Sequence, residues 1–145
     1  GEPDFATPAH IIEAAISALH KGATKYTATA GIPELRAAII TKLKRDNNLT
    51  YVPEEVIASC GAKHSLYACF QAILNPGDEV ILAAPYWVSY VEMIKLAEGV
   101  PVVIDTTGTK FALTAAMVKE KITPKTKAII ICNPSNPTGA VVSDA

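Results

Sequence analysis

The stretch AIIICNPSNPTG (residues 128–139) joins an apolar run to a polar loop that contains two prolines. The apolar run is typical of a strand that is buried on both faces of a parallel sheet. Each proline disfavours the helical conformation in the residue before it, so Asn133 and Asn136 are expected to be extended. Gly139 then lets the backbone turn. The loop is expected to hold an amide at the sheet edge where open α/β folds bind ligands, and a plain strand-terminating turn is the competing interpretation.

The rest of the chain alternates apolar runs with helical patterns of apolar residues. This alternation implies βαβ units with right-handed crossovers, and therefore an α/β fold with a mostly parallel sheet and flanking helices. Strands are predicted over residues 55–60, 79–83, 100–105 and 127–132, with a further short strand at 111–113. Helices are predicted over residues 8–21, 33–46, 62–74, 86–97 and 115–122.

The composition bounds the class of protein. The 145 residues suit one domain or part of one, and half of them are hydrophobic, which is enough for a core. A net charge of −1 without a basic stripe gives no indication of nucleic-acid binding, and no apolar stretch is long enough to span a bilayer. The histidines show no metal-ligand spacing, so no metal is expected. Cys60, Cys69 and Cys132 form no CxxC pair and are predicted to be reduced, mostly buried thiols of a cytoplasmic protein.

Three further residues stand where a ligand could be bound. Gly61 lies where a strand is predicted to pass into a helix, and the N–H groups at the start of that helix suit a phosphate, although plain βα turns look the same. Pro85 fixes the backbone before Trp87, whose indole suits either stacking on a planar ligand or core packing. Tyr26 lies in a polar loop and suits either a hydrogen bond to an anion or the cover of a helix pair.

Six motifs, in this order, resemble the class I and II aminotransferases, which are pyridoxal-phosphate enzymes of fold type I. The resemblance is greatest to the bacterial-type aspartate aminotransferase branch and covers nearly the whole chain. It implies transfer of an amino group between an L-amino acid, with aspartate or glutamate leading, and a 2-oxo acid. The motifs are GEPDF (residues 1–5), KYT (25–27), GIPELR (31–36), NPGDEV (75–80), PYWVSY (85–90) and NPSNPTG (133–139).

The resemblance also implies roles for individual residues. Trp87 stacks on the pyridine ring of pyridoxal 5'-phosphate, and Asn136 hydrogen-bonds the 3-hydroxyl oxygen of that ring. Both residues also line the substrate site, where Asn136 helps to hold the α-carboxylate. The backbone N–H groups of Ala62 and Lys63, at the Gly61 turn, bind the cofactor phosphate.

Three more roles follow from the same resemblance. Tyr26 reaches the cofactor phosphate of the partner subunit in a homodimer, and Gly1 lies against the substrate. Lys63 matches a residue that meets the distal carboxylate of aspartate or glutamate. The competing interpretation of Lys63 is an exposed lysine in the first turn of a helix.

The chain departs from the family pattern at residues that matter for catalysis. Neither Asp105 nor Arg36 matches the motif of the aspartate that pairs with the pyridinium nitrogen or of the arginine that holds the α-carboxylate. The family uses a lysine, in a Ser-Lys context, that forms a Schiff base with the cofactor, and no lysine of this chain follows a serine. We therefore expect residues 1–145 to be part of a pyridoxal-phosphate-binding large domain without a complete second domain, inactive alone. Two alternatives stay open. One is another fold type I enzyme (an aromatic, prephenate or alanine aminotransferase, or a C–S lyase), and the other is a non-catalytic chain that docks with a partner.

Overall fold

The computed structural model describes residues 4–142, which form two compact units divided after Ala58. Gly1 lies outside the described residues, so its predicted contact with a substrate stays a prediction.

The first unit is built from two helices and a short 3-10 turn, α1 (Ala9–His20), α2 (Pro33–Asn47) and η1 (Pro53–Glu55). Pro33 occupies the first turn of α2, where its missing N–H is not needed. Helix α2 ends at Asn48, which adopts the left-handed conformation with φ 53°. Both helices confirm the predicted elements to within a residue or two.

The strand predicted over residues 55–60 is wrong. Pro53 begins η1, and residues 56–59 have no regular secondary structure. The side chain of Arg36 donates to the carbonyl oxygens of Pro53 and Val56, which are groups that a neighbouring strand would otherwise use. The N–H of Ala58 instead bonds the carbonyl of Ala30 in the preceding loop, at 2.9 Å. An arginine side chain and a loop thus take the place of a sheet partner.

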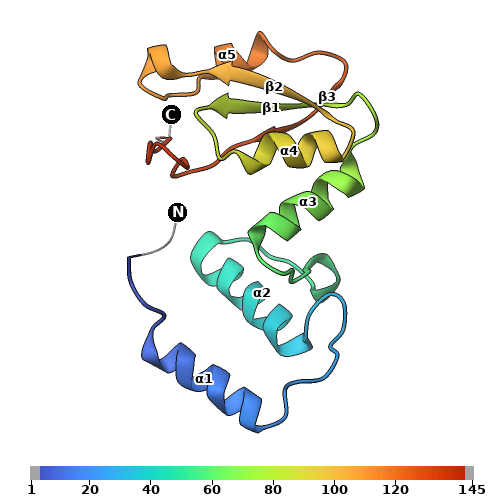
Figure 1. Ribbon diagram of the computed structural model, residues 1–145, viewed down its shortest axis with the longest axis vertical. Coiled ribbons are helices and arrows are strands. Elements are labelled where there is room, and N and C mark those ends of the chain that lie inside the picture. Colours follow the sequence, from blue (N-terminus) through green and yellow to red (C-terminus); the bar gives the residue numbers. More distant parts are fainter. Residues whose placement is uncertain (1–3, 143–145) are drawn as a thin grey trace. The chain divides into compact units, whose positions relative to one another are not determined.

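The second unit carries the sheet. Its three strands are all parallel and lie in the order β2-β1-β3 (Figure 1). Helix α4 connects β1 to β2, and α5 lies between β2 and β3. The elements are α3 (Ala62–Ile73), β1 (Glu79–Ala84), α4 (Ser89–Leu96), β2 (Val100–Asp105), η2 (Thr107–Thr109), α5 (Ala115–Lys119) and β3 (Thr126–Ile130).

The strand order places α4 and α5 on opposite faces of the sheet. The chain moves from β1 to β2 in one direction, and then returns past β1 to reach β3. Because crossovers between parallel strands are right-handed almost without exception, reversing the direction moves the connecting helix to the other face. Figure 1 shows this arrangement, with α3 and α4 on one side of the sheet and α5 on the other.

The core lies between the central strand and α3 and α4. Val80 and Leu82 of β1 pack against Phe70 of α3 and Ile94 of α4. Ile81, which points to the opposite face, is only 1% exposed. Burial on both faces explains why the sequence of β1 is an uninterrupted apolar run after Glu79.

Two other expectations for this unit need correction. No strand forms at residues 111–113, because Lys110 and Phe111 both have positive φ, 55° and 67°, which an extended strand does not allow. Helix α5 ends at Lys119, shorter than predicted, although Thr114 caps it as expected by accepting a hydrogen bond from the N–H of Met117. The other strands and helices predicted for the unit are confirmed within one or two residues, except that α4 begins at Ser89, three residues later than predicted.

The cysteines are also less buried than expected. Cys60 and Cys69 are exposed and Cys132 is partly buried, all three with free thiols. Cys60 precedes an exposed turn, and Cys69 lies on a solvent-facing side of α3 in the second unit.

The turn between α4 and β2 depends on Gly99. A Cβ atom at this position would lie 2.9 Å from the Leu74 side chain, 3.0 Å from that of Ile94 and 3.2 Å from the Asp78 carbonyl. We expect Gly99→Ala to lower the free energy of unfolding of the chain by about 1–3 kcal/mol, the usual range for overpacking. Urea unfolding measures the change.

The matched control is Gly108→Ala, because an added Cβ at Gly108 meets no atom within 4 Å. This substitution is expected to change the free energy of unfolding by no more than about 0.5 kcal/mol. Equal effects of the two substitutions would contradict the packing argument.

Candidate functional site

A cavity of about 440 Å³ opens at the carboxyl ends of the three strands. Pro85 and Tyr86 follow β1, Thr106 follows β2, and Asn136 belongs to the loop after β3, and all four line it. Parallel strands bring these loops to one edge of the sheet, which is where open α/β folds bind ligands. Its volume lies in the range of small-molecule sites.

The loop after β3 is held in shape by its own hydrogen bonds. The side chain of Asn133 accepts from the N–H of Val142 at 3.0 Å and donates to its carbonyl at 3.4 Å, which closes the base of the loop. The N–H of Ser135 bonds the carbonyl of Ala140 at 2.8 Å, and Gly139 turns the chain with φ 72°. Of the two asparagines singled out in the sequence, Asn133 therefore holds the loop and Asn136 faces the cavity.

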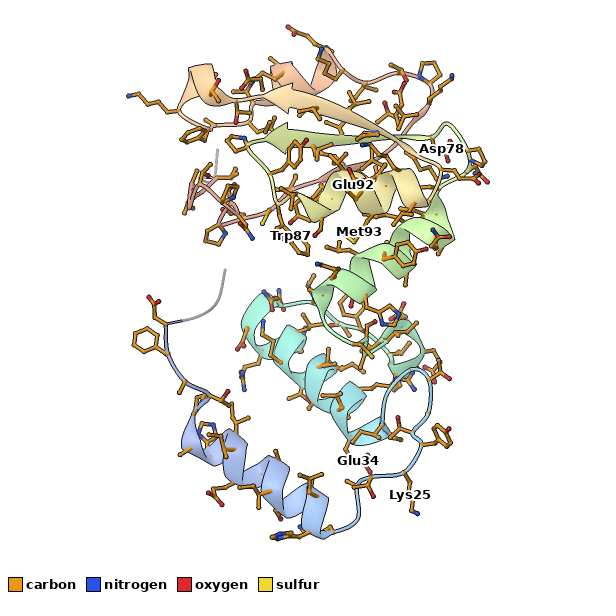
Figure 2. The ribbon with its side chains drawn as sticks, in the orientation of Figure 1. Lys25, Glu34, Asp78, Trp87, Glu92 and Met93 are labelled. Carbon is orange, nitrogen blue, oxygen red and sulfur yellow. The ribbon has the colours of Figure 1, made fainter. Side chains whose placement is uncertain are left out.

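Trp87 lies between β1 and α4, directly before the helix (Figure 2). Its ring makes a T-shaped contact with Tyr90, with centroids 5.4 Å apart and planes at 89°. The Nζ atom of Lys63, in the first turn of α3, lies 5.0 Å from the centroid of the Trp87 ring. The structure thus brings together two predicted site residues from separate motifs, and Trp87 also packs against the core.

The start of α3 is shaped by Gly61. This residue adopts φ 85° and ψ 165°, a conformation that is essentially restricted to glycine. Because glycine has no side chain to cap the helix, no side-chain capping bond forms at this terminus, and the N–H groups of Ala62 and Lys63 stand in an exposed first turn. The hydroxyl of Ser65 points back to the Gly61 carbonyl at 3.4 Å.

Tyr26 belongs to the first unit and its side chain is fully exposed. It lies in the loop between α1 and α2 together with Thr24 and Lys25. Its exposure gives no support to the interpretation that it covers a helix pair.

No motif of the sequence singles out Thr106 as a residue of the site. It is only 2% exposed, and both its N–H and its hydroxyl donate to the carbonyl of Ala84, at 3.0 and 2.7 Å. These bonds fix the end of β1 immediately before Pro85 and Trp87. Threonine is common at strand ends, so its position in the sequence does not reveal that it supports the site.

Tyr90 was also missed as a residue of the site. It is 8% exposed and lines the cavity together with Cys132, which follows β3. Burial, followed by the neighbouring thiol of Cys132, raises the pKa of Tyr90 to about 12. The phenol is therefore a neutral hydrogen-bonding group throughout the physiological range.

Comparison with known proteins places the chain in a family. The family model described as aminotransferase class I and II matches residues 1–145. The chain belongs to this family. It is 58% identical to the aspartate aminotransferase of Bacillus sp. strain YM-2 over 142 residues, which are 97% of this chain and 36% of that protein. It is 53% identical to the aspartate/prephenate aminotransferase of Thermus thermophilus over 142 residues, 97% of this chain and 37% of that protein.

The fold agrees with that of solved class I and II aminotransferases. A structure of the Thermus thermophilus aspartate aminotransferase with maleate superimposes with a TM-score of 0.95 at 52% identity, covering 99% of this chain and 38% of the other. The sheet and flanking helices are therefore a segment of the fold type I architecture, as predicted. The chain spans little more than a third of the length of these relatives. Among residues 4–142, no helix combines the length and apolarity needed to cross a membrane.

The pKa of Tyr90 predicts how stability depends on pH. Because this pKa is raised from 10 to about 12 in the fold, the unfolded chain loses the phenolic proton first as the pH rises. The stability contributed by the neutral phenol is complete below pH 10 and is lost as the pH rises through about 12. We expect Tyr90→Phe to make the fall in the free energy of unfolding over this interval smaller, as measured by urea unfolding.

Tyr67→Phe is the matched control, since Tyr67 is 38% exposed on α3. It is expected to leave the pH dependence as in the wild type. If Tyr90→Phe and Tyr67→Phe had the same pH profile, the assignment of the shift to Tyr90 would be wrong.

Proposed function

We propose that residues 1–145 form part of the pyridoxal-phosphate-binding large domain of an aminotransferase that uses aspartate or glutamate. The observation that carries this proposal is the contact between Lys63 and Trp87, since it sets the start of α3 beside the only tryptophan of the chain. A phosphate-binding helix end and an aromatic ring at one place match the two halves of pyridoxal phosphate, its phosphate and its planar ring.

The phosphate is assigned to the first turn of α3. Gly61 exposes the backbone there, and the N–H groups of Ala62 and Lys63 are donors at the positive end of a helix of 12 residues. In the proposed homodimer, Tyr26 of the partner adds a further donor, and its full exposure supports this role.

The ring of the cofactor is assigned to Trp87 and Asn136. The ring of Trp87 makes a T-shaped contact with Tyr90, and Asn136 lies on the loop after β3, which backbone hydrogen bonds hold in shape. Both side chains are therefore positioned before a ligand binds. Bound pyridoxal phosphate supplies an electron sink that weakens the bonds at the substrate α-carbon. The task of these residues is to orient the ring, and Asn136 and Gly1 also contact the substrate.

Lys63 is assigned to the distal carboxylate of the substrate. Its contact with Trp87 is worth only about 0.5–1 kcal/mol at an exposed site. A hydrogen bond to a charged group contributes about 1.5–3 kcal/mol, so a carboxylate can draw the ammonium away from the ring. The relatives named for aspartate, and the related structure with the dicarboxylate maleate, support a substrate with two carboxylates.

The lysine that attaches the cofactor is assigned to sequence outside these 145 residues. No lysine here follows a serine, and the relatives are nearly three times as long. The three free thiols suit a reducing compartment, and we assign the protein to the cytoplasm.

A related reaction is the second candidate. The Thermus thermophilus relative is named for both aspartate and prephenate, so a prephenate-type acceptor is the alternative that a specific observation favours. Aromatic or alanine aminotransferase activity, a C–S lyase, and a non-catalytic chain that docks with a partner are the remaining alternatives.

The proposal is tested with the complete protein that carries this segment. With pyridoxal phosphate, aspartate and 2-oxoglutarate, we expect glutamate to form, and Lys63→Ala to lower kcat/KM for aspartate about tenfold to a hundredfold through loss of a charged hydrogen bond. An amino acid without a second carboxylate should be affected much less. Prephenate is assayed in parallel as the acceptor.

The control is Lys95→Ala, because Lys95 pairs with Glu92 on the surface of α4, at 3.1 Å. Its kcat/KM should equal that of the wild type. An equal loss for substrates with one and two carboxylates would refute the role of Lys63, and no amino transfer by the wild type would refute the proposed function.

Gly61 gives a second test, of the phosphate site. Gly61→Ala meets no atom within 4 Å, so its effect comes from the backbone conformation alone, at a cost of about 1–3 kcal/mol. A backbone that relaxes from this conformation moves the N–H donors of α3. In the complete protein we expect weaker binding of pyridoxal phosphate, measured by equilibrium dialysis, with the affinity for pyridoxal, which lacks the phosphate, unchanged. Equal weakening of both ligands would contradict the assignment.

A further inference from the structure

The end of β1 is held by a residue that follows the neighbouring strand. The last pair of the ladder between β1 and β2 is Ala84 with Asp105, and Thr106 comes next. The N–H of Thr106 donates to the carbonyl of Ala84 at 3.0 Å, a backbone bond that needs no particular side chain. The hydroxyl of Thr106 donates to the same carbonyl at 2.7 Å. This second bond depends on the residue type, because it needs a short side chain with a hydroxyl.

The two bonds fix the direction in which the chain leaves the strand. A carbonyl oxygen has two lone pairs, and at Ala84 each has a donor. This carbonyl belongs to the peptide that joins Ala84 to Pro85, whose ring fixes the next φ. Few free torsions therefore remain between the held carbonyl and Trp87. The bonds are also shielded from water, since Thr106 is the one buried polar residue among residues 4–142.

The backbone of Trp87 is held from its other side by the start of α4. The Trp87 carbonyl accepts from the N–H of Tyr90 at 3.0 Å, and the rings of the two residues make the T-shaped contact. Tyr90 itself packs in the core. Trp87 thus lies between two anchors in the second unit, Thr106 at the strand end and Tyr90 in the helix.

Thr106 also shapes the wall of the cavity that follows β2. Its carbonyl accepts from the N–H groups of Thr109 and Phe111, at 3.1 and 2.9 Å, so the chain folds back over residues 106–111. Thr106 and Phe111 line the cavity together with Pro85 and Tyr86. One buried residue therefore sets the segment after β1 and the segment after β2 relative to each other.

We propose that Thr106 is a positioning residue, whose hydroxyl bond to the Ala84 carbonyl sets the orientation of the Trp87 ring for a planar ligand. This inference rests on the proposed function, which makes pyridoxal phosphate that ligand. Thr106 is not a catalytic residue, since it acts through the backbone of β1. Without the hydroxyl the backbone bond remains, but the ring of Trp87 is no longer held in one orientation. Part of the binding free energy is then used to order the ring.

The experiment measures the binding of pyridoxal phosphate and of pyridoxal to the complete protein by equilibrium dialysis. Thr106→Val keeps the shape of the side chain and the backbone bond but removes the hydroxyl. It is expected to weaken the binding of both ligands about threefold to tenfold, the effect of one hydrogen bond, because both ligands contain the ring. Gly61→Ala, in contrast, is expected to weaken the binding of pyridoxal phosphate alone.

A graded series tests the hydroxyl itself. Thr106→Ser keeps the donor and should bind both ligands within about twofold of the wild type. Thr106→Cys has a weaker S–H donor and should lie between the serine and valine variants. In a Trp87→Leu background, Thr106→Val should cause no further loss of affinity, because the hydroxyl acts through the ring of Trp87.

The matched control is Thr123→Val, which removes a hydroxyl bond at the opposite end of the same strand. The hydroxyl of Thr123 donates to the carboxylate of Glu79, the first residue of β1, at 2.6 Å. Its loss should leave the affinity for both ligands as in the wild type. The unfolding temperature of every variant is recorded, so that an effect on stability is separated from an effect on binding.

The outcomes separate the two hypotheses. Unchanged affinities in Thr106→Val, or weaker binding of pyridoxal phosphate with pyridoxal unaffected, would overturn the role of Thr106 while the wild type still binds both ligands. An equal loss in Thr123→Val or Thr106→Ser, or a further loss in the Trp87→Leu background, would also overturn it. Failure of the wild type to bind pyridoxal phosphate would overturn the proposed function together with this inference.

Discussion

The parallel pairing of three strands is the constraint on which the candidate site depends. Since β1, β2 and β3 all run in one direction, the loops that follow them open at the same edge of the sheet. Right-handed crossovers then force α4 and α5 onto opposite faces, which leaves space at that edge between the loops. A cavity lined by residues from after each strand is the direct result.

The loops at this edge of the sheet rest on buried residues. The central strand β1 is buried on both faces. The hydroxyl of Thr106, the first residue after β2, donates a hydrogen bond to the carbonyl of Ala84, the last residue of β1. Tyr90 packs in the same core and lines the cavity. Side chains that would contact a ligand therefore project from short, bonded loops above a packed base, and such pre-positioning reduces the entropy lost on binding.

The sequence pattern predicted those strands and helices whose residues carry the signal of their own secondary structure. The strand β1 can be predicted from the sequence because a parallel strand that is buried on both faces is a continuous apolar run. The pattern at residues 55–60 looked similar, but there the side chain of Arg36, far away in the sequence, takes the backbone carbonyls. The positive φ of Phe111 is equally hard to foresee, because the left-handed conformation is rare for an aromatic residue.

The α/β class, the family resemblance and the residue types of the candidate site follow from the sequence alone, because Trp87 and the loop of Asn136 lie in short motifs with fixed order and Gly61 precedes a helical pattern. The contact of Lys63 with Trp87, and the division of roles between Asn136, which faces the cavity, and Asn133, which closes the loop, became visible in the three-dimensional structure alone. The physical reason is that motifs record the local backbone, whereas contacts between them depend on strand order and crossover handedness.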